Sequence, residues 1–281
     1  AINSSLNPRE IDILLDNAIY GNTKFLYVSP ERLKSKLFLA RLPKMKINLI
    51  AVDESHCISQ WGYDFRPAYL EIAKIRQHQP DVPVLALTAT ATKEVVEDIQ
   101  EKLAFKEPNV ISSSFKRDNV IYNLNRSNNK INRIFEFLKD QKGAGIIYCA
   151  TRKDVKFVCK MLVDKGYSAS IYHGGLNAEM RSKHQEQWIN DQVQIMVATN
   201  AFGMGIDKPD VRFVIHHDIP KSIESYYQET GRAGRDGGEG HCLAFYSYKD
   251  IEKLEKFMSG KPVAEQEIGH ALLQEMVAYA E

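Results

Sequence analysis

Short apolar runs of four or five residues alternate with helix-like segments over most of the chain. The runs are continuously apolar rather than alternating with polar residues, as expected for strands that are covered on both faces of a sheet. They lie at Phe25–Val28, Leu49–Val52, Val84–Leu87, Gly145–Tyr148, Ile195–Ala198 and Phe213–Ile215. Repetition of strand, helix and strand predicts a parallel α/β fold, in which chemistry gathers at the carboxyl ends of the strands.

Helix signals lie between these runs. Asn7 is placed to cap a helix that has Pro8 at its first position, and both residue types are favoured there. A second helix is predicted at Asp154–Lys165, and Asn177 is placed to cap a third. Ala264–Ala280 is predicted to be an amphipathic helix.

The polar stretch Asn123–Lys130 has the composition of a linker and lies between two strand-and-helix blocks. It predicts a first lobe over residues 1–122 and a second lobe over residues 123–248. Residues 249–281 are expected to form a helical extension.

Composition limits the kinds of protein this chain could be. Lys and Arg total 37 against 36 for Asp and Glu, so any contact with nucleic acid must come from a few placed residues rather than from global charge. The 4 cysteines show no C-x-x-C spacing, which predicts no zinc ligands in this chain and a reducing compartment. No apolar run approaches 18 residues, so we expect an intracellular protein without a membrane partner.

Two adjacent carboxylates, Asp53 and Glu54, follow the predicted strand Leu49–Val52. In phosphoanhydride hydrolysis one carboxylate can hold Mg²⁺, directly or through water, and its neighbour can polarise the attacking water. Taken alone, the pair has an alternative explanation of about equal weight, in which a capping Asp and a surface Glu simply end a buried strand.

Two arginines, Arg232 and Arg235, stand among glycines in the segment Gln228–Gly237. The arginine guanidinium is a rigid, permanently charged fork that fits phosphate oxygens, and glycine lets the backbone approach a ligand closely. The alternative is a glycine-rich loop with solvated arginines. Upstream, Val197–Asp207 is another strand followed by a glycine-bearing loop, which alone would indicate an ordinary turn between strand and helix.

In this order the segments resemble the motifs of superfamily 2 helicases, and the residues between them narrow the resemblance to the RecQ family of DNA helicases. Asp53–His56 is similar to motif II, although the family usually carries Ala or another small residue at Ser55. Cys57–Pro67 is similar to the aromatic-rich loop, which other superfamily 2 helicases lack. The remaining matches are Thr88–Thr90 with motif III, Ile146–Arg152 with motif IV, Val197–Asp207 with motif V and Gln228–Arg235 with motif VI.

The resemblance implies two RecA-like parallel-sheet lobes, the first of them incomplete, and an ATP-dependent 3′–5′ DNA helicase acting in repair and recombination. Asp53 would organise Mg²⁺ bound with ATP, and Glu54 would activate water. His56 would link the nucleotide site to the DNA side. Arg235, or alternatively Arg232, would reach from the second lobe as an arginine finger onto the γ-phosphate held by the first.

The same resemblance assigns further residues. It adds Gln228 to the catalytic set, and Gly205 and Asp207 to the nucleotide-binding set. Bases stack on aromatic faces for about 1–3 kcal/mol each, which makes the aromatic-rich loop the expected contact with DNA. The alternative is that its large side chains belong to the core. The predicted DNA-binding residues are Trp61, Tyr63, Phe65, Arg66, Arg152, His173 and Thr199. The lone residues His216 and His217 are predicted to be structural.

A helicase of this type binds ATP through the sequence G-x-x-x-x-G-K-[ST]. The chain has one Gly-Lys pair, Gly260–Lys261, and Pro262 follows it. We therefore expect the P-loop before Ala1, the family's zinc-binding module after Glu281, and a chain that is inactive alone. Expected partners are single-stranded and forked duplex DNA, together with other segments or domains of the same protein.

Two other functions stay open at this point. A non-catalytic nucleic-acid-binding or regulatory fragment could keep the fold and lose ATP. A remodelling translocase of superfamily 2 is disfavoured by the loop Ser59–Pro67. The expected location is the cytoplasm, with the nucleoid, for a bacterial source and the nucleus for a eukaryotic one.

Overall fold

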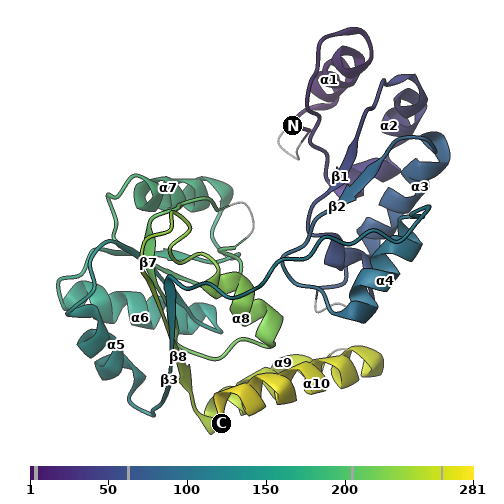
Figure 1. Cartoon of the computed structure of the whole chain (residues 1–281). Helices are drawn as coiled ribbons and strands as arrows, with labels where there is room; N and C mark the ends of the chain where they lie inside the picture. The colour runs from purple at the N-terminus through teal and green to yellow at the C-terminus, as the bar shows by residue number, and fades with distance from the viewer. Residues whose placement is uncertain (3–5, 62–63, 204–205, 261) are drawn as a thin grey trace. The chain divides into compact units, whose positions relative to one another are not determined.

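The computed structural model describes residues 1–2, 6–61, 64–203, 206–260 and 262–281 (Figure 1). Among them the chain forms two compact units, Ala1–Ser112 and Ser113–Glu281. In the described residues, no helix combines the length and the apolar character needed to cross a membrane.

The first unit is built around a pair of short parallel strands, β1 (Ile50–Val52) and β2 (Val84–Ala86). Its core joins side chains from both strands and from every α-helix of the unit. Single turns of 3-10 helix at 30–34, 42–44, 55–58 and 67–69 connect these elements. The helices are α1 (Pro8–Tyr20), α2 (Lys36–Arg41), α3 (Leu70–His78) and α4 (Lys93–Lys102).

Helix α1 begins as the sequence predicts. The Asn7 side chain accepts hydrogen bonds from the backbone N–H groups of Arg9 and Glu10, both at 3.0 Å. The Glu10 carboxylate in turn accepts the N–H of Asn7 at 2.8 Å. This reciprocal pair satisfies donors that the first turn of a helix otherwise leaves unbonded.

The strand predicted at Phe25–Val28 is not formed in the described residues. Val28 makes a single parallel bridge with Ile2, while Phe25 and Tyr27 are 78% and 68% exposed. An apolar run becomes a strand only where a neighbouring backbone is present to pair with it, and the run itself carries no information about that neighbour.

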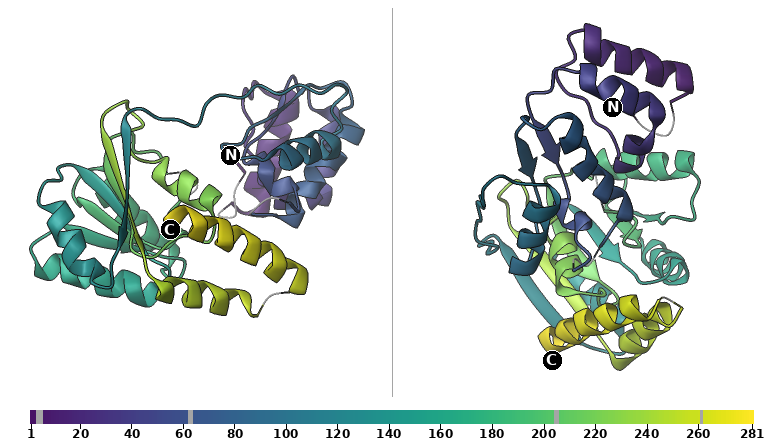
Figure 2. Two further views of the ribbon diagram at one scale, coloured as in Figure 1. Left: turned by 60° about the horizontal axis from the view of Figure 1, so that its bottom comes forward. Right: turned by 90° about the vertical axis from the view of Figure 1, so that its right-hand side faces the viewer.

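The second unit contains a six-stranded sheet in the order β3-β8-β7-β4-β6-β5 (Figures 1 and 2). All of its neighbouring strands pair in parallel. The strands are β3 (Val120–Arg126), β4 (Ala144–Tyr148), β5 (Ala169–Tyr172), β6 (Ile195–Ala198), β7 (Val211–His216) and β8 (Gly240–Tyr246).

Helices cover both faces of this sheet. One core cluster joins α5 (Lys130–Leu138) and α6 (Arg152–Asp164) to one face. The other face packs against Trp188 of α7 (Ala178–Ile189), whose start is capped by the Asn177 side chain as predicted. A further cluster joins strand β8 to three other helices, which are α8 (Ile223–Thr230), α9 (Tyr248–Met258) and α10 (Val263–Ala280).

The predicted linker Asn123–Lys130 differs from the structure. Residues 123–126 belong to strand β3, which pairs with β8 over its whole length, and Lys130 begins α5. The boundary between compact units therefore lies after Ser112 rather than after residue 122. Strand β3 is at the edge of the sheet and most of its side chains are exposed, so its asparagines are tolerated there despite their linker-like composition.

Candidate functional site

The first part of the site is a turn at the carboxyl end of β1. The backbone N–H of Leu87 donates to the carbonyl of Val52 at 2.8 Å, and the backbone N–H of Ser55 donates to the carbonyl of Leu87 at 2.9 Å. Between these bonds Glu54 has a φ angle of 50°, in the left-handed region. A residue other than glycine rarely adopts this conformation, and such residues gather at functional sites.

Asp53 lies at the surface beside this turn. Its carboxylate accepts the backbone N–H of Glu54 at 2.9 Å, and its carbonyl accepts the Tyr69 hydroxyl at 3.3 Å. An exposed carboxylate at the end of a strand offers the hard oxygen ligand that Mg²⁺ prefers, which fits the predicted metal role.

His56 is buried and connects motif II with motif III. Its Nδ1 lies 2.9 Å from Thr88 Oγ1 and 3.5 Å from Glu54 Oε2. The Thr88 hydroxyl donates to the Thr90 carbonyl at 3.1 Å, so its oxygen can accept a hydrogen bond from His56 Nδ1. Burial lowers the pKa of His56, which favours the neutral ring. The contact with Thr88 Oγ1 favours the tautomer that carries its proton on Nδ1.

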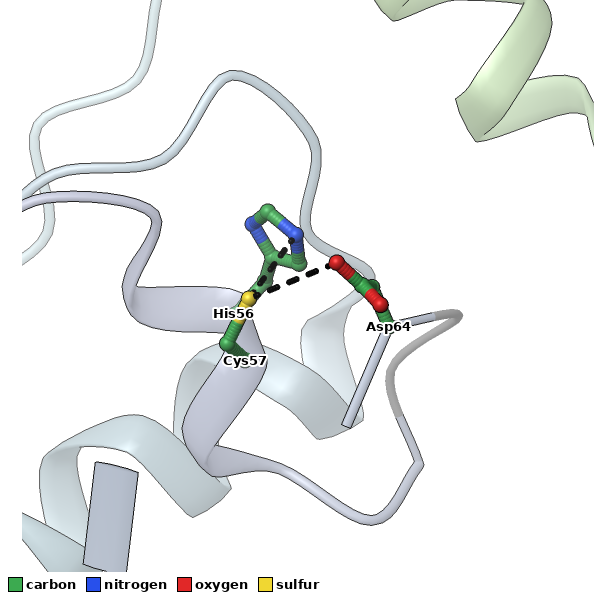
Figure 3. Close-up of side chains that lie close together, drawn as sticks. All are labelled: His56, Cys57 and Asp64. Atoms are coloured by element: carbon green, nitrogen blue, oxygen red, sulfur yellow. Dashed lines mark hydrogen bonds between the residues drawn. The ribbon is translucent and has the colours of Figure 1, made fainter. Parts of the chain in front are cut away.

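Residues of the predicted aromatic-rich loop lie directly against this turn (Figure 3). Cys57 Sγ is 3.6 Å from His56 Nε2 and 3.9 Å from Asp64 Oδ2. Arg66 donates to the same Asp64 oxygen from Nε at 3.1 Å and from Nη2 at 2.6 Å. Its backbone N–H also donates to the Cys57 carbonyl at 2.8 Å. Arg66, predicted to bind DNA, is therefore tied to motif II through Asp64.

The aromatic residues of this loop have different environments. Trp61 is 71% exposed, which excludes the alternative that it is a core residue. Phe65 is partly buried. Tyr63 lies outside the described residues, so its predicted role stays a prediction.

In the second unit, Arg232 and Arg235 follow the end of α8. The Arg232 side chain is buried, and its Nε atom has no hydrogen-bond partner among the described residues. The Arg235 side chain is 40% exposed and lies 3.7 Å from Asp207. It also donates to the carbonyls of Gly231 at 3.2 Å and Ile206 at 3.3 Å. The structure thus brings together Asp207 and Arg235, two of the predicted nucleotide-binding residues.

The electrostatics of the arginine pair follow from this packing. Burial, followed by repulsion from Arg232, lowers the pKa of Arg235, while Asp207 opposes the shift. Arginine nevertheless stays charged at neutral pH. Gly205, assigned with Asp207 to the nucleotide, lies outside the described residues. Gln228, the remaining predicted catalytic residue, lies on α8.

Two residues that hold the motif VI loop were missed from the sequence. Arg117 donates to the carbonyls of Ala233 at 2.8 Å and Gly231 at 3.3 Å. Asn119 Nδ2 donates to the carbonyls of Gly234 at 2.8 Å and Gly238 at 2.7 Å. These bonds join segments more than a hundred residues apart, and no local pattern signals them.

Three predicted DNA-binding residues of the second unit come together at one edge of the sheet. Arg152, His173 and Thr199 follow the carboxyl ends of β4, β5 and β6, which are neighbours in the sheet. His173 is buried, and neither of its ring nitrogens has a hydrogen-bond partner among the described residues. Burial, together with Lys156 and Arg152, lowers its pKa.

The two lone histidines predicted to be structural make buried or half-buried contacts with carboxylates. His216 Nε2 lies 2.7 Å from Glu229, and its ring stacks on Tyr148. His217 Nδ1 lies 3.0 Å from Asp218. Neither histidine belongs to the groups of predicted site residues described above.

A family model matches a segment of each compact unit. Residues 6–99 match the DEAD/DEAH box helicase family, and residues 129–237 match the helicase conserved C-terminal domain. The chain is 42% identical over 282 residues to the ATP-dependent DNA helicase RecQ of Pasteurella multocida, covering 100% of this chain and 45% of that protein. It is 43% identical over 282 residues to the ATP-dependent DNA helicase RecQ of Bacillus subtilis, covering 99% of this chain and 48% of that protein.

A solved structure supports the fold independently. The Mycobacterium smegmatis helicase Lhr bound to single-stranded DNA and AMP-PNP superposes with a TM-score of 0.67 at 19% identity. The match covers 95% of this chain and 36% of that one. The chain spans about half the length of the curated relatives named above. Its similarity to these relatives along nearly its whole length places the chain in the RecQ family of superfamily 2 helicases.

Proposed function

We propose that this chain forms most of the motor core of an ATP-dependent DNA helicase that unwinds DNA in the 3′–5′ direction during repair and recombination. The observation that carries the proposal is the turn after β1, where Glu54 lies beside His56, and His56 contacts Thr88 of motif III. A movement of the Glu54 carboxylate can therefore reach Thr88 of motif III through the buried His56 side chain.

Each catalytic residue has a role that its surroundings support. The exposed Asp53 carboxylate would hold Mg²⁺, which when bound with ATP neutralises charge on the phosphates. Glu54 would take a proton from the attacking water. Arg235, with its more exposed guanidinium, is the preferred arginine finger over the buried Arg232.

The function is tested with the natural gene product that carries these residues. We expect DNA-stimulated ATP hydrolysis and ATP-dependent unwinding of a forked duplex that has a 3′ single-stranded tail. A substrate with only a 5′ tail is the polarity control. DNA binding without ATP hydrolysis or unwinding would favour the alternative of a non-catalytic nucleic-acid-binding module. In the cell, we expect the protein with the nucleoid for a bacterial source and in the nucleus for a eukaryotic one.

The 281 residues taken alone should behave differently. They contain no G-x-x-x-x-G-K-[ST] sequence, whose backbone N–H groups and lysine cradle the phosphates of ATP. A polypeptide of these residues is therefore expected to show no DNA-stimulated ATP hydrolysis above background. Phosphate release is measured beside the natural gene product, and turnover by the 281-residue polypeptide would contradict the expectation.

Trp61 provides the test of DNA contact. Its indole is 71% exposed, and the loss of one stacked base costs about 1–3 kcal/mol. Trp61→Ala should therefore weaken binding of single-stranded DNA by about 5- to 150-fold. Fluorescence anisotropy measures the affinity, and Tyr248→Ala is the control because Tyr248 is 72% exposed on α9. An equal loss of affinity for single-stranded DNA in both variants would contradict the assignment of Trp61 as a DNA contact.

A further inference from the structure

Three side chains that commonly bind metals meet where motif II joins the aromatic-rich loop. His56, Cys57 and Asp64 each offer one ligand atom, and these atoms all lie within 4.8 Å of one another. In Figure 3, dashed lines run from the cysteine sulfur to the histidine ring and to the Asp64 carboxylate. His56 and Cys57 are buried, while the Asp64 side chain is 38% exposed, so an ion could enter from the Asp64 side.

The two distances from the sulfur are close to those around a tetrahedral ion. Cys57 Sγ lies 3.6 Å from His56 Nε2 and 3.9 Å from Asp64 Oδ2. A tetrahedral zinc ion with a Zn–S distance of about 2.3 Å and a Zn–N distance of about 2.0–2.1 Å places sulfur and nitrogen about 3.6 Å apart. The carboxylate oxygen needs only a small movement to reach the same distance from the sulfur.

The surrounding hydrogen bonds prepare each ligand atom. His56 Nδ1 contacts Thr88 Oγ1 at 2.9 Å, which leaves the Nε2 lone pair facing the sulfur. Metal-bound histidines usually have such a partner on the other ring nitrogen, and metal-bound carboxylates are usually hydrogen-bonded as well. Arg66 supplies the second kind of bond by donating to Asp64 Oδ2. Both of these bonds end on Oδ2, so the Asp64 carboxylate would bind an ion through its other oxygen, Oδ1.

Against the expectation from the cysteine spacing, we propose that His56 Nε2, Cys57 Sγ and the Asp64 carboxylate bind one thiophilic divalent cation, best matched by Zn²⁺, with a fourth position open to solvent. A thiolate and an imidazole favour Zn²⁺ over Mg²⁺, which prefers oxygen ligands. Binding forms a metal–sulfur bond and releases the thiol proton to solvent. Without a cation, burial raises the pKa of the Cys57 thiol to about 12, so the cysteine stays protonated.

A cation at this site would fix Asp64 of the loop against His56 of motif II. Resting on the proposed function, the consequence is that zinc holds the aromatic-rich loop in one position and slows the DNA-stimulated motor. The site itself is tested by binding, which does not depend on ATP hydrolysis. Failure of the motor proposal and failure of the zinc proposal can therefore be told apart.

The experiment titrates the 281-residue polypeptide with Zn²⁺ against a chromophoric chelator and, separately, with Co²⁺. We expect one Zn²⁺ per chain and a thiolate-to-cobalt charge-transfer band. Cys57→Ser should remove that band, and both Cys57→Ser and Asp64→Asn should weaken Zn²⁺ binding by at least about 10-fold. Cys159→Ser is the matched control, because Cys159 lies half-buried on α6, and it should bind like the unchanged chain.

Two results would overturn the site. One is an unchanged chain that fails to compete with the chelator for Zn²⁺. The other is a Cys57→Ser variant that binds Zn²⁺ and shows the cobalt band as the unchanged chain does. Circular dichroism establishes that each variant is folded. If Cys57→Ser does not fold, Asp64→Asn decides, because the carboxylate is partly exposed and its amide keeps the same shape.

Discussion

Arg235→Ala is expected to lower the kcat of DNA-stimulated ATP hydrolysis in the natural gene product by about 10³–10⁵, the range found for removal of arginine fingers. The proposed finger stabilises charge that develops on the transferring phosphoryl group, so its loss should reduce kcat far more than it raises the KM for ATP. In this structure the guanidinium is held by Asp207 and by two backbone carbonyls, all of which are weak enough to exchange for a phosphate.

Companion variants separate the two candidate fingers. Arg232→Ala removes a buried guanidinium that packs beside Gly203, so it should reduce stability as well as activity. Arg235→Lys keeps the charge but loses the planar fork, and it should recover only part of the rate. Arg133→Ala is the surface control, since Arg133 pairs with Glu136 on the exposed side of α5. Arg235 would lose its assignment if Arg235→Ala stayed within tenfold of the unchanged protein.

Strands covered on both faces could be predicted from the sequence. β4 and β6 are buried along their full lengths, and the same apolar runs mark them in the sequence. Edge strand β3 was missed because exposed positions admit asparagine and arginine. In that strand, pairing with β8 determines the structure, and the pairing partner lies more than a hundred residues away.

The residues of the candidate site also divide into those that a local sequence pattern indicates and those that it does not. Asp53, Glu54 and His56 are consecutive or nearly so, and a strand followed by two carboxylates is a local pattern. Arg117 and Asn119 could not be found, because their role is to bind the carbonyls of a distant loop. Backbone carbonyls belong to every residue type, so no composition identifies which loop an arginine will hold.

The left-handed backbone conformation of Glu54 could not be predicted from the sequence either. It bears on the choice of substitution at Glu54, which is the second change expected to have a large effect. Glu54→Gln keeps the size of the side chain, so the turn and its contact with His56 should persist. The change removes the basic oxygen that the proposed mechanism needs. General bases contribute about 10²–10⁴ to a rate, so the kcat of ATP hydrolysis should fall by that factor while ATP still binds.

The measurement compares steady-state hydrolysis with binding of a fluorescent ATP analogue by the natural gene product. Glu136→Gln is the matched control, because Glu136 is an exposed partner of Arg133 on α5, and its kcat should not change. Asp53→Asn supplies the contrast, since loss of a magnesium ligand should raise the Mg²⁺ concentration needed for half-maximal rate. Glu54→Gln should leave that concentration unchanged. If both variants shifted the Mg²⁺ requirement equally, the two carboxylates would share the metal, and the water would need a different base.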